Sequence, residues 1–113
     1  MAVPVKRDLK ITRGDTETIV VNQTGSDGVT PVNITGRVYT AQLRTTPDIA
    51  AISASFSCTV TDGPNGQTTC VLSATSSATL DPGYYYYDLQ ENTAGVISTL
   101  LAGIVTVDPD VTR

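Results

Sequence analysis

The sequence predicts an all-β fold, a sandwich of antiparallel sheets, and three observations support that prediction. Threonine, valine and isoleucine are abundant, whereas lysine and glutamate, which fill exposed helix faces, are scarce, and only 16% of the residues are charged. Short segments alternate apolar and polar residues, as a strand with one wet face does. Turn-forming residues interrupt these segments every ~8–12 residues. We therefore expect about seven short strands.

The first third of the chain predicts two strands and a long polar loop. Residues 8–11 alternate polar and apolar side chains, and residues 16–22 have an apolar centre. Arg13-Gly14-Asp15 fits a tight turn between them. Residues 23–28 are turn formers with nothing apolar to bury. We expect residues 31–36 to be extended at a sheet edge, because their proline cannot donate a hydrogen bond to a central ladder.

The middle of the chain has the clearest strand patterns. Residues 37–44 predict a third strand with three apolar residues on one face: Tyr39, Ala41 and Leu43. Residues 53–61 alternate four apolar residues with serine and threonine: Ala54, Phe56, Cys58 and Val60. The turn cluster at 62–66 predicts a hairpin whose partner strand is residues 67–73.

A hairpin that is symmetric about Pro64 predicts three cross-strand pairs on the core face: Val60–Thr68, Cys58–Cys70 and Phe56–Leu72. The cysteine pair could close into a disulfide, although such cross-strand bridges are geometrically demanding. Two small buried thiols are the expected state. A metal site would need further cysteine or histidine ligands, and the chain has no histidine.

The last third predicts a helical turn and two longer strands. Residues 73–80 suit one helical or 3₁₀ turn that crosses between the sheets. Asp81-Pro82-Gly83 is a turn signal, after which four consecutive tyrosines begin a strand. Residues 96–107 form the final strand. We expect the alternation of its inward-facing residues to shift by one residue near Gly103, because a glycine within a strand often marks a bulge.

About seven strands with regularly spaced turns are the pattern of an immunoglobulin-like antiparallel β-sandwich. We expect residues 1–113 to form this single domain, with short extended termini at about 1–7 and 108–113. The start of the chain lacks the apolar core of a secretory signal, so export by that route is not expected.

Alternation divides the four tyrosines between the two faces of their strand. Tyr85 and Tyr87 share a face with Leu89, and we place them in the core because the other face ends in polar residues. Tyr84 and Tyr86 then point outward. Tyrosine is common at interfaces, so both are candidate interface residues. The alternative is that they pack on neighbours of the same sheet face.

Composition and motifs exclude several classes of function. Without histidine there is no Ser-His-Asp or Cys-His nucleophile, and no Gly-rich phosphate loop is present. Four carboxylates lie near predicted turns and are explained by turn chemistry: Asp62, Asp81, Asp88 and Glu91. We expect no enzyme, no cofactor and no metal site. Arg13-Gly14-Asp15 matches an adhesion tripeptide, but ordinary turn chemistry accounts for it.

The expected partners are proteins. A net charge of −4 argues against nucleic acid, because a nucleic-acid binder needs a basic face. Four of the seven basic residues, Lys6, Arg7, Lys10 and Arg13, do cluster near the start, which predicts a solvated first strand or a short basic arm. No apolar run approaches the ~20 residues that cross a bilayer, so no membrane partner is expected.

Four stretches together resemble a known family: residues 11–16 (ITRGDT), 32–44 (VNITGRVYTAQLR), 80–90 (LDPGYYYYDLQ) and 99–107 (TLLAGIVTV). They are similar to the small immunoglobulin-like modules of tailed-phage structural proteins, in particular to the N-terminal domain of the phage baseplate upper protein family. The resemblance implies a non-enzymatic virion component, made in the host cytoplasm, that docks in many copies to other virion structural proteins.

The resemblance leaves the place in the particle open. Family members often continue into a fibre or receptor-binding region, and this sequence stops at Arg113. A tail, baseplate or fibre adaptor is the first expectation, and a capsid decoration protein is the alternative. The flanking segments are candidate latches onto a neighbouring subunit, through Val3, Pro4 and Val5 at one end and Val111 and Arg113 at the other. A carbohydrate- or cell-surface-binding module that uses the outward tyrosines is a different class of function.

Overall fold

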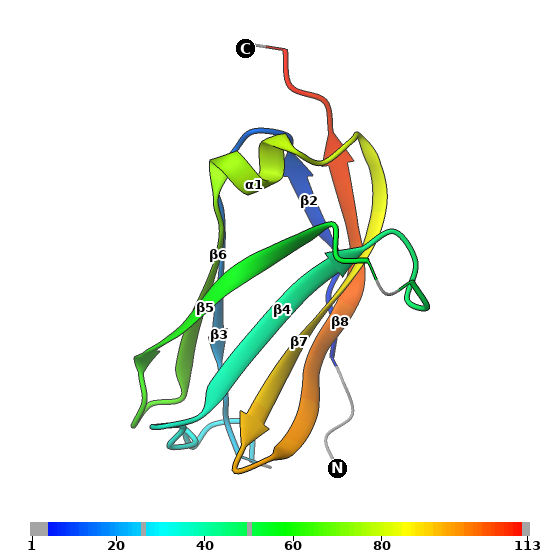
Figure 1. The fold of residues 1–113 in the computed structure, drawn as a ribbon. Coiled ribbons are helices and arrows are strands. Elements are labelled where there is room, and N and C mark those ends of the chain that lie inside the picture. The colour runs from blue at the N-terminus through cyan, green and yellow to red at the C-terminus, as the bar shows by residue number, and fades with distance from the viewer. Residues whose placement is uncertain (1–4, 26, 50, 112–113) are drawn as a thin grey trace.

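Two β-sheets pack face to face in the computed structural model, which describes residues 5–25, 27–49 and 51–111 (Figure 1). The fold is all-β and immunoglobulin-like, as predicted. Within the described residues the elements follow one another as strands β1 (Val5–Lys6), β2 (Leu9–Thr12), β3 (Glu17–Asn22), β4 (Val38–Arg44), β5 (Ala54–Asp62) and β6 (Gln67–Leu72), the short helix α1 (Ala74–Ala78), and strands β7 (Gly83–Thr93) and β8 (Val96–Asp108).

Strand β5 belongs to both sheets and joins them. Its first residues pair with β4, whereas the stretch from Ser57 onward pairs with β6. Sheet A therefore contains β5, β4, β7 and β8 in that order, with β1 and β2 along the far side of β8. Sheet B contains the rest of β5, then β6 and β3. The two sheets are thus one continuous hydrogen-bonded path that folds back on itself at β5.

The pairing of β1 and β2 with β8 is parallel and departs from the predicted antiparallel arrangement. Leu9 pairs with Val105 and Ile11 with Val107, so β2 runs in the same direction as β8. Parallel neighbours need a long crossover between them, and here the rest of the sandwich supplies it. The alternation within residues 8–11 predicts a strand but carries no information about a partner at the far end of the sequence.

The glycine inside β8 marks a close backbone approach, and the predicted change of phase at that position is wrong. The inward residues Leu101, Val105 and Val107 keep a single phase through Gly103. A Cβ atom at Gly103 would lie 2.3 Å from the carbonyl oxygen of Arg7, where the chain passes from β1 to β2. The register shift between β7 and β8 lies instead just before Leu101. Glycine is needed here to let a second backbone pass over the strand.

The β5–β6 hairpin forms two of the three predicted pairs, Val60–Thr68 and Cys58–Cys70. Both cysteine thiols are free. The third pair, Phe56 opposite Leu72, is wrong, because Phe56 pairs with Ala41 of β4. The cause is the transfer of β5 between sheets, which occurs between Phe56 and the next residue.

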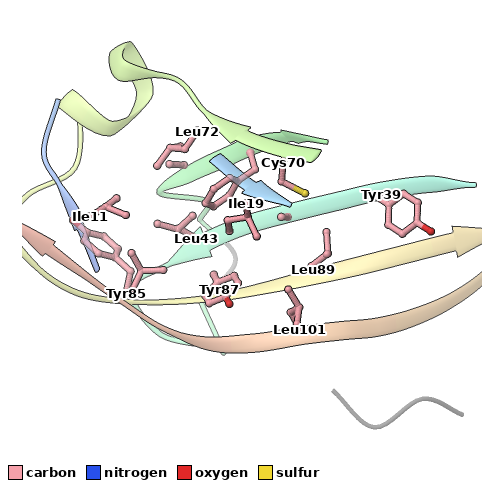
Figure 2. Packing of buried hydrophobic residues seen from close by; sticks show 14 of the residues in the cluster. Ile11, Ile19, Tyr39, Leu43, Cys70, Leu72, Tyr85, Tyr87, Leu89 and Leu101 are labelled. Carbon is pink, nitrogen blue, oxygen red and sulfur yellow. The ribbon is translucent and has the colours of Figure 1, made fainter. Parts of the chain in front are cut away.

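The core lies between the sheets and contains the side chains that alternation places inward (Figure 2). The buried hydrophobic residues of β4, β5 and β7 are Tyr39, Ala41 and Leu43 of β4, Ala54 and Phe56 of β5, and Tyr85, Tyr87 and Leu89 of β7. Ile19 and Leu72 meet them from sheet B. The face assignment of the four tyrosines is therefore confirmed.

Both inward tyrosines of β7 donate their hydroxyl groups to backbone carbonyls. The Tyr85 hydroxyl donates to the Asp81 carbonyl at 2.8 Å, which is the tyrosine-corner arrangement of sandwich folds. The Tyr87 hydroxyl donates to the Arg7 carbonyl at 2.5 Å and so ties the crossing between β1 and β2 to the centre of sheet A. A buried hydroxyl without a hydrogen-bond partner would lower the stability of the fold by about 1–3 kcal/mol. These two bonds remove that cost, so both tyrosine rings can be buried in the core.

The helix α1 confirms the predicted crossing between sheets. It follows β6 of sheet B and precedes β7 of sheet A, at the upper end of the molecule in Figure 1. The side chain of Ser73 caps its start by accepting a hydrogen bond from the Ser76 N–H at 3.1 Å. Ser77 is fully buried, and its hydroxyl donates to the Asp15 carbonyl at 2.7 Å, which attaches the helix to the turn between β2 and β3.

The segment 31–36 is the predicted extended segment only at its start. Pro31 forms an antiparallel bridge with Thr24 and the Val32 N–H donates to the Gln23 carbonyl at 3.0 Å, whereas the chain turns after Ile34. Ile34 is fully buried, and its N–H donates to the Gly63 carbonyl at 2.8 Å. The segment therefore closes one end of the sandwich against the β5–β6 turn, a role that depends on contacts distant in sequence.

Candidate functional site

The outer face of sheet A contains a groove that crosses β4, β7 and β8. It has a volume of about 510 Å³, and its lining includes Lys6, Arg44, Tyr86, Asp88 and Ile104. The cross-strand register explains the grouping, because Tyr86 pairs with both Arg44 and Ile104. A second hollow of about 370 Å³ adjoins the first and shares Arg44 and Asp88 with it. Alternation places these side chains on one face, and the register between neighbouring strands brings them together.

The two outward tyrosines lie on this face but differ in surroundings. Tyr86 is 41% exposed and forms part of the groove wall. Tyr84 is 74% exposed, lies outside the groove, and pairs across the strands with Thr106 of β8. The structure therefore brings the two predicted interface residues of β7 onto one continuous surface.

Two side chains of opposite charge, Asp88 and Arg44, line the groove. Asp88 of β7 is opposite Gln42 of β4, and Arg44 is two residues further along β4. Arg44 donates to the Gln42 side-chain oxygen at 2.9 Å and to the Ile49 carbonyl at 3.1 Å, so its guanidinium is held in place. Burial raises the pKa of Asp88, and the positive charge of Arg44 only partly offsets that effect. The groove thus combines a partly desolvated carboxylate, a fixed guanidinium and an aromatic wall.

The predicted terminal latches fall largely outside the described residues. Val3, Pro4 and Arg113 lie outside them. Val5 lies in β1, where its backbone pairs with Leu101. Val111 is 97% exposed and makes no strand. The N-terminal segment is consequently part of sheet A from Val5 onward, and Lys6 borders the groove.

Arg13-Gly14-Asp15 is joined to α1 and is not a projecting tip. The Arg13 side chain donates to the Ala78 carbonyl at 3.1 Å. The Gly14 N–H donates to the Ser77 hydroxyl at 2.9 Å, and Gly14 has φ +86°, which glycine adopts without strain. The turn therefore has a structural explanation, in line with the turn chemistry that the sequence indicates.

Glu91 belongs to a buried polar cluster that the sequence interpretation missed. Its carboxylate accepts hydrogen bonds from the Tyr39 hydroxyl at 2.7 Å, from the Gln23 amide at 3.0 Å and from the Arg37 guanidinium at 3.2 Å. Burial alone would raise the pKa of Glu91, but the hydrogen bonds from Tyr39 and Gln23 and the charge of Arg37 together lower it. Burial and the Glu91 carboxylate raise the pKa of Tyr39.

The sequence did contain a signal for this cluster. Glu91 is two residues beyond Leu89, so the alternation that buries Tyr85, Tyr87 and Leu89 continues inward to Glu91. Its neighbours come from β4 and from the loop after β3, and no local pattern links those segments. Three side chains donate hydrogen bonds to the Glu91 carboxylate, so this buried charge is stabilised within the fold.

Asp62 lies at the turn between β5 and β6, where the sequence predicts it. Asp62 accepts a hydrogen bond from the Asn65 amide at 2.9 Å within the β5–β6 turn, as turn chemistry predicts. Across residues 5–25, 27–49 and 51–111, no group of three metal-ligating side chains occurs. In the same part of the chain, no helix is long and apolar enough to cross a membrane.

Comparison with known proteins finds similar solved structures but no matching family. No family model matches the sequence, and no curated protein matches it. Among solved structures, the chain is similar to the extracellular fragment, with its stalk region, of novel immune-type receptor 11 from Ictalurus punctatus. The identity is 13%, the TM-score is 0.41, and the match covers 98% of this chain and 90% of that one. The fold itself, two sheets joined by a shared strand, is that of an immunoglobulin-like sandwich.

Proposed function

We propose that this protein is a non-enzymatic structural component of a tailed-phage virion, a tail, baseplate or fibre adaptor that works through protein–protein contacts. The observation that supports this function is the outer face of sheet A, where Tyr84 and Tyr86 stand exposed beside a groove. The stretches that resemble the phage modules lie largely in β4, β7 and β8, the strands that build this face. Its partners are other virion proteins, in many copies.

The face has the composition of a protein–protein contact surface. Tyrosine and arginine are enriched at interfaces, and they dominate the residues whose truncation weakens binding most. Tyr86 and Arg44 are cross-strand neighbours in its groove, whose lining also includes the apolar Ala102 and Ile104 of β8. Arg44 is already positioned by Gln42 and Ile49, so little side-chain freedom is lost when a partner binds.

The test is assembly of virions with a Tyr84→Ala, Tyr86→Ala double variant. We expect its incorporation into particles to fall by more than about tenfold, with a midpoint of thermal unfolding within a few degrees of the parent. The matched control is Val38→Ala with Val96→Ala, two exposed residues of sheet A away from the groove. The control should be incorporated normally. Normal incorporation of the tyrosine variant would reject this face as the docking surface.

Two alternatives use the same surface. A capsid decoration protein would dock by the same contacts on the shell, and imaging of labelled protein on intact particles separates the two locations. A carbohydrate- or cell-surface-binding module is favoured by one observation, the proximity of Tyr86 to the polar groups of Gln42 and Asp88 in a groove. That reading predicts glycan or cell binding that Tyr86→Ala abolishes. A parent protein that binds no glycan and no host cell rejects it.

A further inference from the structure

Strand β3 is the outermost strand of sheet B. Among the described residues it pairs only with β6, through six consecutive residue pairs from Glu17–Leu72 to Asn22–Gln67. The preceding strand, β2, does not cover it, because β2 pairs with β8 in the other sheet. The remaining long side of β3 therefore has no partner strand in the described part of the chain.

The direction of the backbone groups along β3 follows from one hydrogen bond. The Gln23 N–H donates to the Gly66 carbonyl at 2.9 Å, which continues the ladder to β6 by one pair. In an antiparallel strand, alternate residues direct both backbone groups to the same side. Ile19 and Val21 therefore direct both of their backbone groups to β6, in phase with the Gln23 N–H. The N–H and C=O groups of the alternate residues, Thr18, Val20 and Asn22, face the unpaired side.

The β3 edge lacks the features that usually prevent edge pairing. Its six residues include no lysine, proline or glycine, and its register with β6 is uninterrupted. The edge of sheet A differs, because β1 and β2 are short, are separated by a crossing, and carry Lys6 and Lys10. Val20, at the middle of β3, is 45% exposed on the outer face. One of the two edges is thus protected and the other is open.

The open edge is complementary to a second copy of itself. Antiparallel pairing of the outward-facing residues across a two-fold axis places Val20 opposite Val20 of the other copy and Thr18 opposite Asn22. Glu17 then faces Gln23, so no like charges meet, although the chain has a net charge of −4. Each outward donor meets an acceptor in this register, with about two hydrogen bonds for each such pair.

We propose that β3 pairs with β3 of a second copy of this chain and that the two sheets B become one continuous sheet across the dimer. This inference goes beyond the proposed function, because it uses the opposite sheet and leaves Tyr84 and Tyr86 exposed. A single strand pair buries less than ~1,200 Å², so the dimer is weak in solution, in the micromolar range. Many copies held close together in an assembly would favour it further.

Sedimentation equilibrium of the full chain tests the dimer. We expect a concentration-dependent monomer–dimer equilibrium for the parent and an association constant reduced by more than about tenfold in Val20→Lys, because two lysines would meet on the axis. Val38→Lys, at an exposed position of sheet A, is the matched control and should associate like the parent. A parent that stays monomeric up to about 1 mM, or a Val20→Lys variant that associates like the parent, overturns the proposal.

Oxidative cross-linking tests the register independently. Residues that face each other in a hydrogen-bonded antiparallel pair have Cα atoms about 5.5 Å apart, within the reach of a disulfide. Val20→Cys should therefore form a covalent dimer under mild oxidation, whereas Thr18→Cys, which faces Asn22 of the other copy, should not. The parent, whose thiols Cys58 and Cys70 are half-buried and buried, gives the background. Efficient cross-linking of Thr18→Cys with none for Val20→Cys contradicts the register.

Discussion

The two faces of β7 show how one residue type acquires two roles from its position alone. Tyr85 and Tyr87 point into the core, and each hydroxyl donates to a backbone carbonyl of a neighbouring segment. Tyr84 and Tyr86 point outward and remain 74% and 41% exposed. The inward pair fastens a turn and the β1–β2 crossing to the strand, whereas the outward pair is exposed on the surface of sheet A. The pleat of the strand, and not the tyrosine itself, assigns the role.

Truncation of an inward tyrosine should have the largest effect on stability. Tyr87→Ala removes a buried ring and its hydrogen bond to Arg7, so we expect a loss of about 3–5 kcal/mol in the free energy of unfolding, measured with urea. Tyr87→Phe keeps the ring and loses only the hydrogen bond, at about 1 kcal/mol. If Tyr86→Ala costs as much as Tyr87→Ala, the division between the two faces is incorrect.

A side chain at Gly103 should be the next most damaging change. Its Cβ would lie 2.3 Å from the Arg7 carbonyl oxygen, so Gly103→Ala must push the β1–β2 crossing off β8. We expect a loss of about 1–3 kcal/mol by chemical denaturation. The control is Gly25→Ala, where the nearest atom would be 3.7 Å from the new Cβ. Equal stability of the two variants would mean that the crossing moves aside at no cost.

The sequence predicts the faces of the strands well and their distant partners poorly. Alternation correctly buries Tyr39, Phe56, Tyr85 and Tyr87, because the period of a strand is a local property. The parallel pairing of β2, the reason for Gly103 and the transfer of β5 between sheets all depend on segments far apart in the chain. A glycine inside a strand has several structural causes, and the sequence alone does not select among them.

The candidate site, too, could be predicted where it depends on a local pattern and could not where it depends on distant pairing. Alternation alone places Tyr84 and Tyr86 outward, and the structure bears this out. The groove beside them needs the register of β4, β7 and β8, which brings Arg44 to Tyr86 and was beyond the sequence pattern.

The Glu91 cluster should make stability depend on pH in the acid range. The pKa of Glu91 in the folded protein is lowered from its usual value of 4.5, so its contribution is fully present above that pH and is lost as the pH falls through the lower folded value. Glu91→Gln should cost about 1–3 kcal/mol at pH 7 and should flatten the loss of stability below pH 4.5, as measured by urea denaturation at a series of pH values.

Glu17→Gln provides a control of opposite sign for that measurement. Burial and the nearby charge of Asp15 raise the pKa of Glu17, so ionisation of Glu17 opposes folding and the substitution should not remove acid sensitivity. A Glu91→Gln variant whose pH profile has the shape of the parent profile would show that the hydrogen bonds from Tyr39 and Gln23 do not hold the carboxylate in its charged form.

Truncation of the most exposed tyrosine should have the smallest effect on the isolated domain. Tyr84 is 74% exposed and has no buried contact to lose, so Tyr84→Ala should change the free energy of unfolding by no more than about 0.5 kcal/mol. If the same variant also weakens docking, the contrast between the two faces of β7 becomes clearer, because the inward tyrosines then determine stability and the outward ones binding. A large loss of stability would mean that Tyr84 packs on its own sheet.

The most direct test of the outward face is hydroxyl-radical footprinting of the protein, free and within intact virions. We expect Tyr84 and Tyr86 to be modified readily in the free protein and to be protected in the particle. Val29, which is 78% exposed in the loop between β3 and β4, is the control and should stay reactive in both states. Equal modification of the two tyrosines in free protein and particle would contradict the claim that the outer face of sheet A is the docking surface.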